Sequence, residues 1–384
     1  MTSLTFTEHA LPYCVFSRGT DRPRVGAGFG TYLIDLHRMF GDPIFAGPSL
    51  NAFMSRGPRA WQRTRERLLG AARSGQIGEL VPIAEATLHL PFEVADFADF
   101  YSSLEHATNA ARVLRPGDPQ LARNWREMPV GYHGRAGTVV VSGTDIVRPS
   151  GQRKGPDDPA PVFGPSVRLD IEAELGFVVG VGSPLGTAIA TGAFADHVFG
   201  VVLVNDWSAR DLQAWEYVPL GPHLGKSFAT SVSAWVVPLA ALAAARVPLP
   251  GQHPAVLPYL RETQDWGLDI DLAVAWNGEV ITRPPYRTMY WSPAQMLAHL
   301  TVNGASARTG DLFASGTISG PDRDQRGAFI ELTWGGAEPV TVRGDQRTFL
   351  QDGDTVTITA TAPGAAGRRV GFGEVTGVIR PARP

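Results

Sequence analysis

The sequence predicts a β-rich α+β protein: a small β-rich region over residues 1–90, then a mixed β-roll or barrel-like region over residues 91–384. Three observations support this fold class. Short apolar runs typical of strands outnumber helical patterns, and abundant glycine (43) and proline (31) separate them. Regular strand–helix alternation is missing, which argues against a doubly wound parallel sheet. Hydrophobic residues make up 43% of the 384 positions, enough for a sizeable core.

The first region is predicted to contain two short strands and one helix. Arg24–Gly28 and Thr31–Leu36 have strand-like composition around a glycine turn. Ala60–Ser74 has helical periodicity, with a basic and polar face opposite Leu68 and Leu69.

The second region is predicted to be built mainly from strands. The expected strands are Val139–Val141, Arg168–Val179, Gly200–Asn205, Leu268–Trp276, Phe329–Trp334 and Thr355–Thr361. The expected helices are Ser103–Leu114, Ala193–Phe199, Ser208–Trp215 and Pro293–Val302.

Charge and cysteine content exclude several classes of function. With 34 basic and 37 acidic residues the net charge is −3, so we expect no nucleic-acid partner. Cys14 is the only cysteine, which rules out an internal disulfide and a thiolate metal cluster. No secretory signal is visible, and the apolar stretch Trp235–Ala245 is shorter than the about 20 residues of a membrane span. We therefore expect a soluble cytoplasmic protein without a membrane partner.

A first polar group lies in Asp99–His106. Ser102 and Glu105 have the spacing of a capping box, which predicts a helix start there. Asp99 would then lie in the preceding turn and His106 in the first helical turns. For this segment alone, a purely structural histidine on a helix is the better explanation.

A second group consists of three acidic residues on one predicted strand. Alternate side chains share a strand face, so Glu172 and Glu174 should point the same way, with Asp170 beside them. Carboxylates this close repel one another unless they are solvated or share a cation, and their oxygens suit Mg²⁺ or Ca²⁺. A charged outer face of a half-buried sheet is the more common explanation of such a pattern taken alone.

The third group follows the apolar run Val201–Val204. A helix is predicted to start there with Asp206 or Ser208 as its cap. Arg210 and Gln213 lie three positions apart, so they should be neighbours on one helix face. These two side chains could bind a substrate anion while Asp206 binds a cation.

Two further segments complete the set of polar groups. The loop Pro219–Ser227 resembles a phosphate-binding loop but has the wrong glycine spacing, so Lys226 is better interpreted as a fixed positive charge. Glu331 is expected on the strand Ala328–Trp334, where a buried carboxylate would need a partner such as an active-site histidine.

Taken together, these segments resemble the fumarylacetoacetate hydrolase family over nearly the whole chain. The stretches that carry the resemblance are Asp99–Asn109, Pro129–Arg135, Asn205–Ser227 and Gly310–Pro321. The resemblance implies an N-terminal SH3-like β-barrel over residues 1–90, a catalytic domain over residues 91–384 and a homodimer. It also implies metal-dependent hydrolysis of the carbon–carbon bond of 4-fumarylacetoacetate to fumarate and acetoacetate, the last step of tyrosine and phenylalanine catabolism.

The resemblance also implies a role for each site residue. Ca²⁺ or Mg²⁺ would be bound by Asp99, Glu172, Glu174 and Asp206, with Lys226 and Thr230 near a second, Mg²⁺-associated position. His106 would be the catalytic base and Glu331 its orienting carboxylate, while Arg210 and Lys226 would stabilise an oxyanion. The substrate-contacting positions would be Tyr101, Arg115, Tyr132, Gln213, Tyr217 and Thr317.

Two alternatives remain beside this hypothesis. One keeps the fold but changes the reaction to that of an acylpyruvase, an oxaloacetate decarboxylase or a dienoate isomerase. The other is a non-enzymatic binding protein whose acidic cluster holds a structural Ca²⁺. The Asp99–His106 segment argues against the first, and the expected donors Arg210, Gln213 and Lys226 argue against the second.

Overall fold

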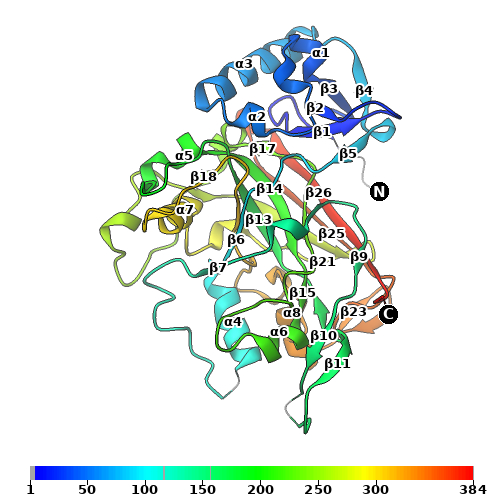
Figure 1. Cartoon of the computed structure of the whole chain (residues 1–384), viewed down its shortest axis with the longest axis vertical. Helices are drawn as coiled ribbons and strands as arrows, with labels where there is room; N and C mark the ends of the chain where they lie inside the picture. Colours follow the sequence, from blue (N-terminus) through cyan, green and yellow to red (C-terminus); the bar gives the residue numbers. More distant parts are fainter. Residues whose placement is uncertain (1–4, 116, 156, 384) are drawn as a thin grey trace.

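The computed structural model describes residues 5–115, 117–155 and 157–383. Figure 1 shows the N-terminal region, in blue, at one end of the molecule, next to a larger β-rich body. No helix in these described ranges is long and apolar enough to cross a membrane.

The N-terminal region is an antiparallel sheet covered by helices. Its strand order is β4-β3-β2-β1-β5, where β1 is Tyr13–Ser17, β2 Arg24–Phe29, β3 Tyr32–Asp35, β4 Leu80–Pro82 and β5 Thr87–His89. The turn between β2 and β3 contains Gly30 at φ 58°, a left-handed conformation that glycine adopts without steric cost. The helices are α1 (Leu36–Phe40), α2 (Asn51–Met54) and α3 (Pro58–Ser74). The two strands and the helix expected here are confirmed.

The sheet that carries the polar groups is mixed and deeply buried. Its order is β7-β6-β22-β13-β14-β16-β8, with β17 also paired to β14. Its strands are β6 (Phe97–Phe100), β7 (Gly131–His133), β8 (Val139–Val141), β13 (Ala173–Val179), β14 (Val198–Asp206), β16 (Thr230–Val232), β17 (Val237–Pro238) and β22 (Leu312–Ala314). Every residue of β13 and β14 is buried, as their continuous apolar composition predicts.

A further sheet packs against this one. Its order is β21-β20-β25-β26-β9, formed by β9 (Ile146–Val147), β20 (Asp271–Trp276), β21 (Glu279–Thr282), β25 (Thr355–Pro363) and β26 (Arg369–Arg380). Burial alternates along β25, so only one of its faces enters the core. Val201 and Leu203 of β14 share that core with Ile358 and Val375. The predicted β-rich α+β class is confirmed.

Shorter elements surround the two packed sheets. Strand pairs are formed by β10 (Ser150–Arg153) with β11 (Val162–Pro165), β12 (Leu169–Asp170) with β15 (Ser208–Ala209), β18 (Arg246–Val247) with β19 (Gly267–Leu268), and β23 (Val340–Val342) with β24 (Asp345–Arg347). The remaining helices are α4 (Leu104–Leu114), α5 (Phe194–His197), α6 (Arg210–Glu216), α7 (Pro293–Thr301) and α8 (Phe329–Leu332).

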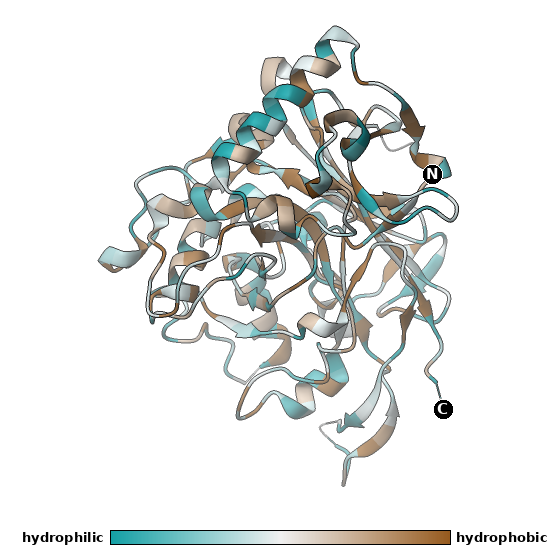
Figure 2. Cartoon of the chain, turned by 45° about the horizontal axis from the view of Figure 1, so that its top comes forward, coloured by the Kyte–Doolittle hydropathy of each residue, from teal (hydrophilic) through white to brown (hydrophobic). Residues whose placement is uncertain are grey.

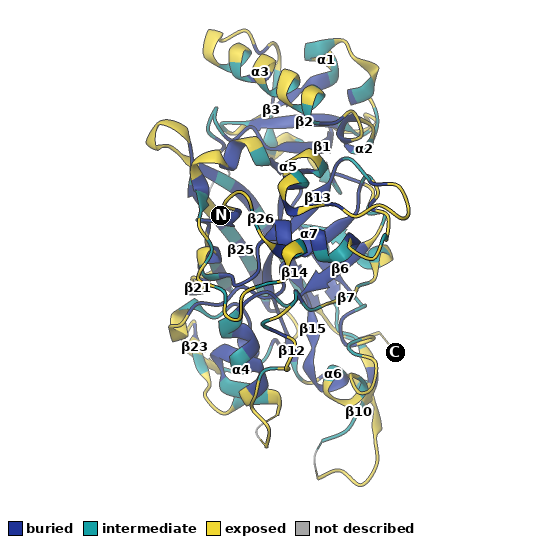
Figure 3. Ribbon diagram, turned by 90° about the vertical axis from the view of Figure 1, so that its left-hand side faces the viewer, coloured by how far each residue is buried: buried dark blue, intermediate teal, exposed yellow. Residues whose placement is uncertain are grey.

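The N-terminal region and the larger body share a hydrophobic core. Val15 and Leu36 belong to the same buried cluster as Val178, Phe199 and Val236 of the larger body. Figure 2 shows the hydrophobic segments concentrated in the central strands, and Figure 3 shows these strands buried while one side of α3 is exposed.

The prediction of a strand over Phe329–Trp334 is wrong. Phe329–Leu332 forms the short helix α8, and a 3₁₀ turn follows over Trp334–Gly336. All four residues of α8 are buried, so the apolar run gave no periodicity that could separate a strand from a helix.

The predicted continuous strand Arg168–Val179 is also wrong, because it is interrupted at Ile171 and Glu172 between β12 and β13. The expected strand Leu268–Trp276 is likewise divided, between β19 and β20. The helix expected over Ala193–Phe199 is shorter, since β14 begins at Val198.

Two predicted caps need correction. The N-cap of α4 is Ser103, not Ser102, and its side chain accepts a hydrogen bond from the His106 amide. Helix α6 begins at Arg210 after Ala209, so neither Asp206 nor Ser208 caps it. Asp206 is instead the last residue of β14.

Candidate functional site

Strands of the mixed sheet, with β22 between β6 and β13, bring the predicted acidic residues together in the interior. Asp99 lies on β6 and Glu174 on β13, while Glu172 comes directly before β13. One carboxylate oxygen from each of these three side chains lies within 4.8 Å of the other two. All three residues are buried, so their charges are withdrawn from water.

This cluster fits a cation. Both carboxylate oxygens of Glu174 and Oδ1 of Asp99 are buried without a hydrogen-bond partner among the described residues. Burial, followed by repulsion from neighbouring carboxylates, raises the pKa of Asp99 and of Glu174 well above the usual range. A set of hard carboxylate oxygens suits Ca²⁺ or Mg²⁺. A cation there would compensate the charges that no side chain neutralises.

Asp206 differs from Glu174 because both its oxygens are engaged. Oδ1 accepts a hydrogen bond from Thr230 Oγ1 at 2.6 Å, across the β14–β16 pair. Oδ2 accepts from Tyr132 Oη at 3.0 Å and from Lys226 Nζ at 3.1 Å. The predicted residues Lys226, Thr230 and Tyr132 therefore all meet at Asp206.

Two buried cations neutralise Glu172. Lys226 Nζ lies 2.5 Å from its Oε2, and Arg210 Nη1 lies 2.8 Å from its Oε1. Although burial opposes ionisation, Lys226 and Arg210 together lower the pKa of Glu172 well below its usual range. Glu172 is thus the carboxylate that links the acidic cluster to the cationic side chains.

His106 and Glu331 form a buried pair, as the sequence predicts. His106 Nδ1 lies 2.6 Å from Glu331 Oε2. Burial opposes ionisation of Glu331, but His106, Asn109 and Ser319 lower the pKa of this carboxyl below its usual value. Because an ionised carboxylate only accepts hydrogen bonds, the imidazole proton must be on Nδ1. Nε2 is then the ring nitrogen that can accept a proton.

Sequence reasoning missed two partners of Glu331. Asn109 Nδ2 donates to Oε1 at 3.0 Å, and Ser319 Oγ donates to Oε2 at 2.9 Å. The signal for Asn109 was its position three residues after His106 on the same helix face. No local pattern in the sequence indicates that Ser319 contacts Glu331.

A cleft of about 360 Å³ brings together most of the predicted substrate-binding residues. Tyr101, Arg115, Gln213 and Tyr217 line it together with Arg210. Arg210 Nη1 donates to Gln213 Oε1 at 3.1 Å, as their spacing on α6 predicts, whereas Nη2 is buried without a partner among the described residues. Arg210 therefore lines the cleft and keeps one buried guanidinium nitrogen that no described residue binds.

Thr317 and Tyr132 do not line this cleft. Thr317 is buried, and its hydroxyl has no hydrogen-bond partner within the described ranges. Tyr132 lies at Asp206. The Tyr101 ring is an edge-on neighbour of the His106 imidazole at 5.3 Å between centroids, which connects the cleft to the buried pair.

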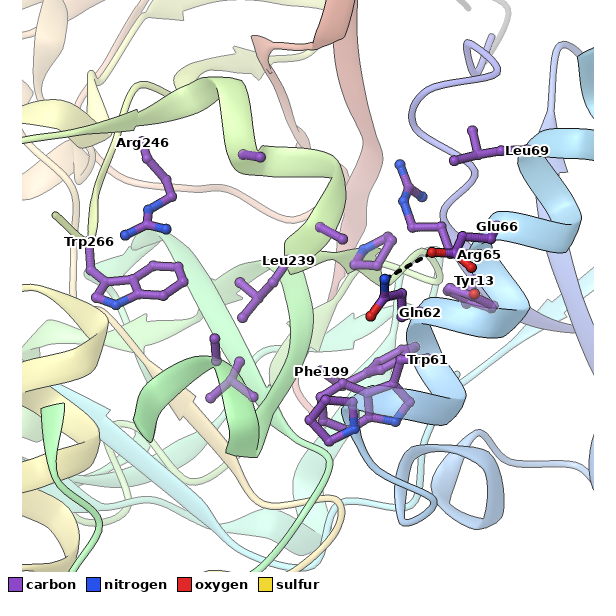
Figure 4. A pocket seen from close by; sticks show the side chains of 16 residues that line it. Tyr13, Trp61, Gln62, Arg65, Glu66, Leu69, Phe199, Leu239, Arg246 and Trp266 are labelled. Carbon is purple, nitrogen blue, oxygen red and sulfur yellow. Dashed lines mark hydrogen bonds between the residues drawn. The ribbon is translucent and has the colours of Figure 1, made fainter. Parts of the chain in front are cut away.

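A larger hollow of about 440 Å³ lies between α3 and the strands β14 and β17. Figure 4 shows Trp61, Phe199 and Leu239 among its lining side chains, with Gln62 bound to Glu66. The Arg65 guanidinium is occupied by the carbonyls of His9 and Ala10. This lining is mainly apolar, and Arg65, Glu66 and Arg246 are its charged members.

Comparison with known proteins agrees with this arrangement. Residues 9–91 match the model described as fumarylacetoacetase N-terminal, and residues 96–377 match that of the fumarylacetoacetate hydrolase C-terminal domain. Fumarylacetoacetase of Homo sapiens is 46% identical, covering 98% of this chain and 96% of that protein. Fumarylacetoacetase of Arabidopsis thaliana is 41% identical, covering 97% of this chain and 95% of that protein.

Solved structures share the fold at low sequence identity. A putative HpcE protein from Mycobacterium smegmatis has a TM-score of 0.61 and 19% identity, covering 97% of this chain and 100% of that chain. A fumarylacetoacetate hydrolase from Exiguobacterium antarcticum has a TM-score of 0.58 and 17% identity over the same shares. With both domain models matched in order, the chain belongs to the fumarylacetoacetate hydrolase family.

Proposed function

We propose that the protein hydrolyses the carbon–carbon bond of 4-fumarylacetoacetate, giving fumarate and acetoacetate. The observation that carries the proposal is the buried His106–Glu331 pair near a buried acidic cluster, in which Asp99 Oδ1 and both Glu174 oxygens have no partner among the described residues, and a cleft lined by Arg210. The full-length relatives named fumarylacetoacetase support the same reaction.

Asp99, Glu172, Glu174 and Asp206 would hold the cation, either Ca²⁺ or Mg²⁺. Bound there, the cation would polarise the carbonyl of a chelated 1,3-diketone as a Lewis acid. Lys226 offsets part of the negative charge through its contacts with Glu172 and Asp206. Thr230 orients Asp206 from the neighbouring strand. We assign both residues to support of the cation site.

His106 acts as the general base in this proposal. Its Nε2 removes a proton from water while Glu331 holds the ring through Nδ1 and stabilises the imidazolium. The water oxygen adds to the carbonyl carbon, and Arg210, Gln213 and Lys226 stabilise the oxyanion. The carbon–carbon bond then breaks, its electron pair leaves with the acetoacetate carbon, and His106 returns the proton to that carbon.

Substrate contacts are assigned to the residues of the cleft and its inner end. Arg115 and Arg210 provide positive charge for a substrate that carries two carboxylates. Tyr101, Gln213 and Tyr217 provide hydrogen-bonding groups along the cleft. Tyr132 and Thr317 would contact the substrate next to the acidic cluster.

We propose the following organisation for the whole protein. Residues 1–90 form an SH3-like β-barrel domain, residues 91–384 form the catalytic domain, and two copies form a homodimer. The protein works in the cytoplasm on a small diketo acid in tyrosine and phenylalanine breakdown, without nucleic-acid or membrane partners.

Product analysis tests this function. Purified protein with Mg²⁺ or Ca²⁺ is incubated with 4-fumarylacetoacetate, and fumarate and acetoacetate are quantified. Recovery of both in equal amounts is the expected result. Faster cleavage of an acylpyruvate would instead support the related-enzyme alternative. A rise in melting temperature with cation but no turnover of any diketo acid would support a structural Ca²⁺ site.

A further inference from the structure

Asp170 was expected beside Glu172 and Glu174, but the structure places its carboxylate in a different set of contacts. Asp170 is fully buried, and its Oδ2 accepts a hydrogen bond from Arg210 Nε at 2.8 Å. The same carboxylate accepts from the backbone amides of Phe329, at 2.8 Å to Oδ1, and Ile330, at 3.1 Å to Oδ2. The break in the strand at Ile171 and Glu172 separates Asp170 from the acidic cluster.

The first contact fixes the orientation of Arg210. Asp170 binds the guanidinium through Nε, while Glu172 and Gln213 bind it through Nη1. With Nε and Nη1 held, the remaining nitrogen Nη2 has no partner among the described residues, and the arginine lines the cleft. The direction of the free donor therefore depends on the Asp170 contact.

The second contact fixes the start of α8. Ala328, the N-cap residue of this helix, contributes no side-chain hydrogen bond, so the Asp170 carboxylate serves the first two amides in its place. Glu331 follows one residue after Ile330 on this short helix and binds His106. The placement of the imidazole therefore depends, through α8, on the same carboxylate.

We propose that Asp170 is a positioning residue that holds the oxyanion donor Arg210 and the Glu331–His106 pair in one geometry. This role deepens the proposed hydrolysis and rests on it. Asparagine at this position has one acceptor oxygen and one donor nitrogen. Whichever way the asparagine amide is turned, its NH₂ group would face another donor, either the Nε–H of Arg210 or a backbone N–H at the start of α8.

The kinetic test introduces Asp170→Asn into three proteins, namely native protein, Arg210→Lys and Glu331→Gln, and compares kcat and KM with and without the substitution. In the native background we expect kcat to fall about 30- to 100-fold while KM changes less than about threefold. In the Arg210→Lys and Glu331→Gln backgrounds, the fold-decrease in kcat caused by Asp170→Asn should be about tenfold smaller than in the native background. One of the two groups that Asp170 positions is already altered there. An equal fold-decrease in kcat in all three backgrounds would overturn the proposal, because a general structural defect lowers kcat by the same factor in each background.

Asp35 offers a matched control. It is also a buried aspartate that accepts from an arginine Nε, that of Arg24 at 2.6 Å, and from a helix amide, that of Arg38 at 3.1 Å. It lies at the start of α1 in the N-terminal region. Asp35→Asn should lower the melting temperature while leaving kcat within about twofold of native. A loss of kcat in this variant as large as in Asp170→Asn would overturn the specific role of Asp170.

A spectroscopic readout separates this proposal from the proposed function, because it requires no turnover. The His106 Nδ1 proton in its short hydrogen bond to Glu331 should give a far-downfield NMR resonance, assigned by its loss in His106→Ala. Asp170→Asn should shift or broaden this resonance, and Asp35→Asn should not. An unchanged resonance in folded Asp170→Asn would overturn the positioning role, whatever reaction the protein catalyses.

If Asp170→Asn does not fold, Arg210→Lys tests the same coupling from the other side. Loss of the Nε contact frees one anchor of the Asp170 carboxylate, so exchange of the Phe329 and Ile330 amides with solvent should become faster. Unchanged exchange at both amides would contradict the coupling.

Discussion

Glu174 is a buried carboxyl, and burial together with the neighbouring carboxylates raises its pKa well above the usual range, so its charged form is destabilised. Both its oxygens lack hydrogen-bond partners among the described residues, and Asp99 and Glu172 lie beside it. Removing this charge relieves repulsion when no cation is bound but removes a ligand when one is. The same substitution should therefore have opposite effects in the two conditions.

We predict that Glu174→Gln stabilises the chelator-treated protein by about 1–3 kcal/mol and destabilises the cation-loaded protein relative to native. Melting temperatures of both proteins, measured with chelator and with Ca²⁺ or Mg²⁺, test this. A native protein that is more stable than the variant under chelation would argue against an uncompensated acidic cluster.

At the residue scale, some contacts between the candidate site residues were predictable from the sequence and others were not. The pairing of His106 with Glu331 and the contact of Arg210 with Gln213 are confirmed. The contacts of Asp170 were not predictable, because they depend on a strand break after which the pairing partner changes from β15 for β12 to β14 for β13. Alternation along one strand would have kept Asp170 with Glu172 and Glu174.

At the scale of elements, α4 carries His106 and depends on its cap. Ser103 accepts from the His106 amide at 3.2 Å and donates to the Ser319 carbonyl at 3.2 Å. Ser103→Ala should cost about 1–2 kcal/mol of unfolding free energy and accelerate amide exchange at His106. Ser102→Ala is the matched variant, since the Ser102 hydroxyl contacts Met296 Sδ instead. Faster exchange at His106 in Ser102→Ala than in Ser103→Ala would contradict this cap assignment.

Glu262 links the segment before β19 to the start of α7. Its side chain accepts a hydrogen bond from Ser292, the N-cap of α7, and both Asp265 and Arg246 act on it electrostatically. Burial, reinforced by Asp265, raises the pKa of Glu262 to about 7, although Ser292 and Arg246 oppose the shift.

A carboxyl whose pKa is raised on folding stabilises the folded state at low pH, and this stability is lost as pH rises from about 4.5 to about 7. Because Glu262 is half-buried, we expect a loss of about 1–2 kcal/mol over this window. Glu262→Gln should remove that part of the pH dependence in denaturant unfolding measured from pH 4 to 8. An unchanged slope would show that Glu262 titrates normally.

Helices and strands were predicted most accurately where only one face of the element is buried. Helix α3 has one buried residue, Leu68, opposite an exposed polar face, and its pattern was recognisable. The error at α8 arose in a fully buried segment, whose first amide donates to the distant Asp170 side chain. Buried runs of this length carry no periodic signal.

At the scale of the whole molecule, the N-terminal region shares its core with the larger body. Phe199 of β14 is nearly fully buried and contacts the rings of Tyr13, Phe53 and Trp61 at centroid distances of 5.3, 5.7 and 5.3 Å. This aromatic cluster joins β14 to the N-terminal strands and helices, so the two regions should unfold together.

We predict that Phe199→Ala costs about 3–5 kcal/mol and that the protein unfolds in one transition before and after the change. Urea unfolding followed by tryptophan fluorescence and by circular dichroism tests this, with the exposed Phe163→Ala as a control that should change stability by less than about 0.5 kcal/mol. Separate transitions in native protein would show that the two regions are independently stable.

The fold class could be predicted from composition and turn spacing, whereas the packing of the sheets could not. Strand order such as β6-β22-β13-β14 brings together residues more than 100 positions apart, and no local pattern encodes it. This order is nevertheless what places Asp99 beside Glu174. The chemistry of the site therefore depends on long-range strand pairing. The motifs do not predict this pairing by themselves, and only the resemblance to a known family indicates it.

The most direct test of the account is the initial rate of loss of diketone absorbance with 4-fumarylacetoacetate and cation-loaded protein. Native protein and His106→Ala are compared at matched folded concentration. We predict rapid loss with native protein and a decrease of at least about 10³-fold in His106→Ala, because this variant lacks Nε2, the proposed acceptor of the water proton. A rate in folded His106→Ala within about tenfold of native would contradict the assignment of His106 as the base.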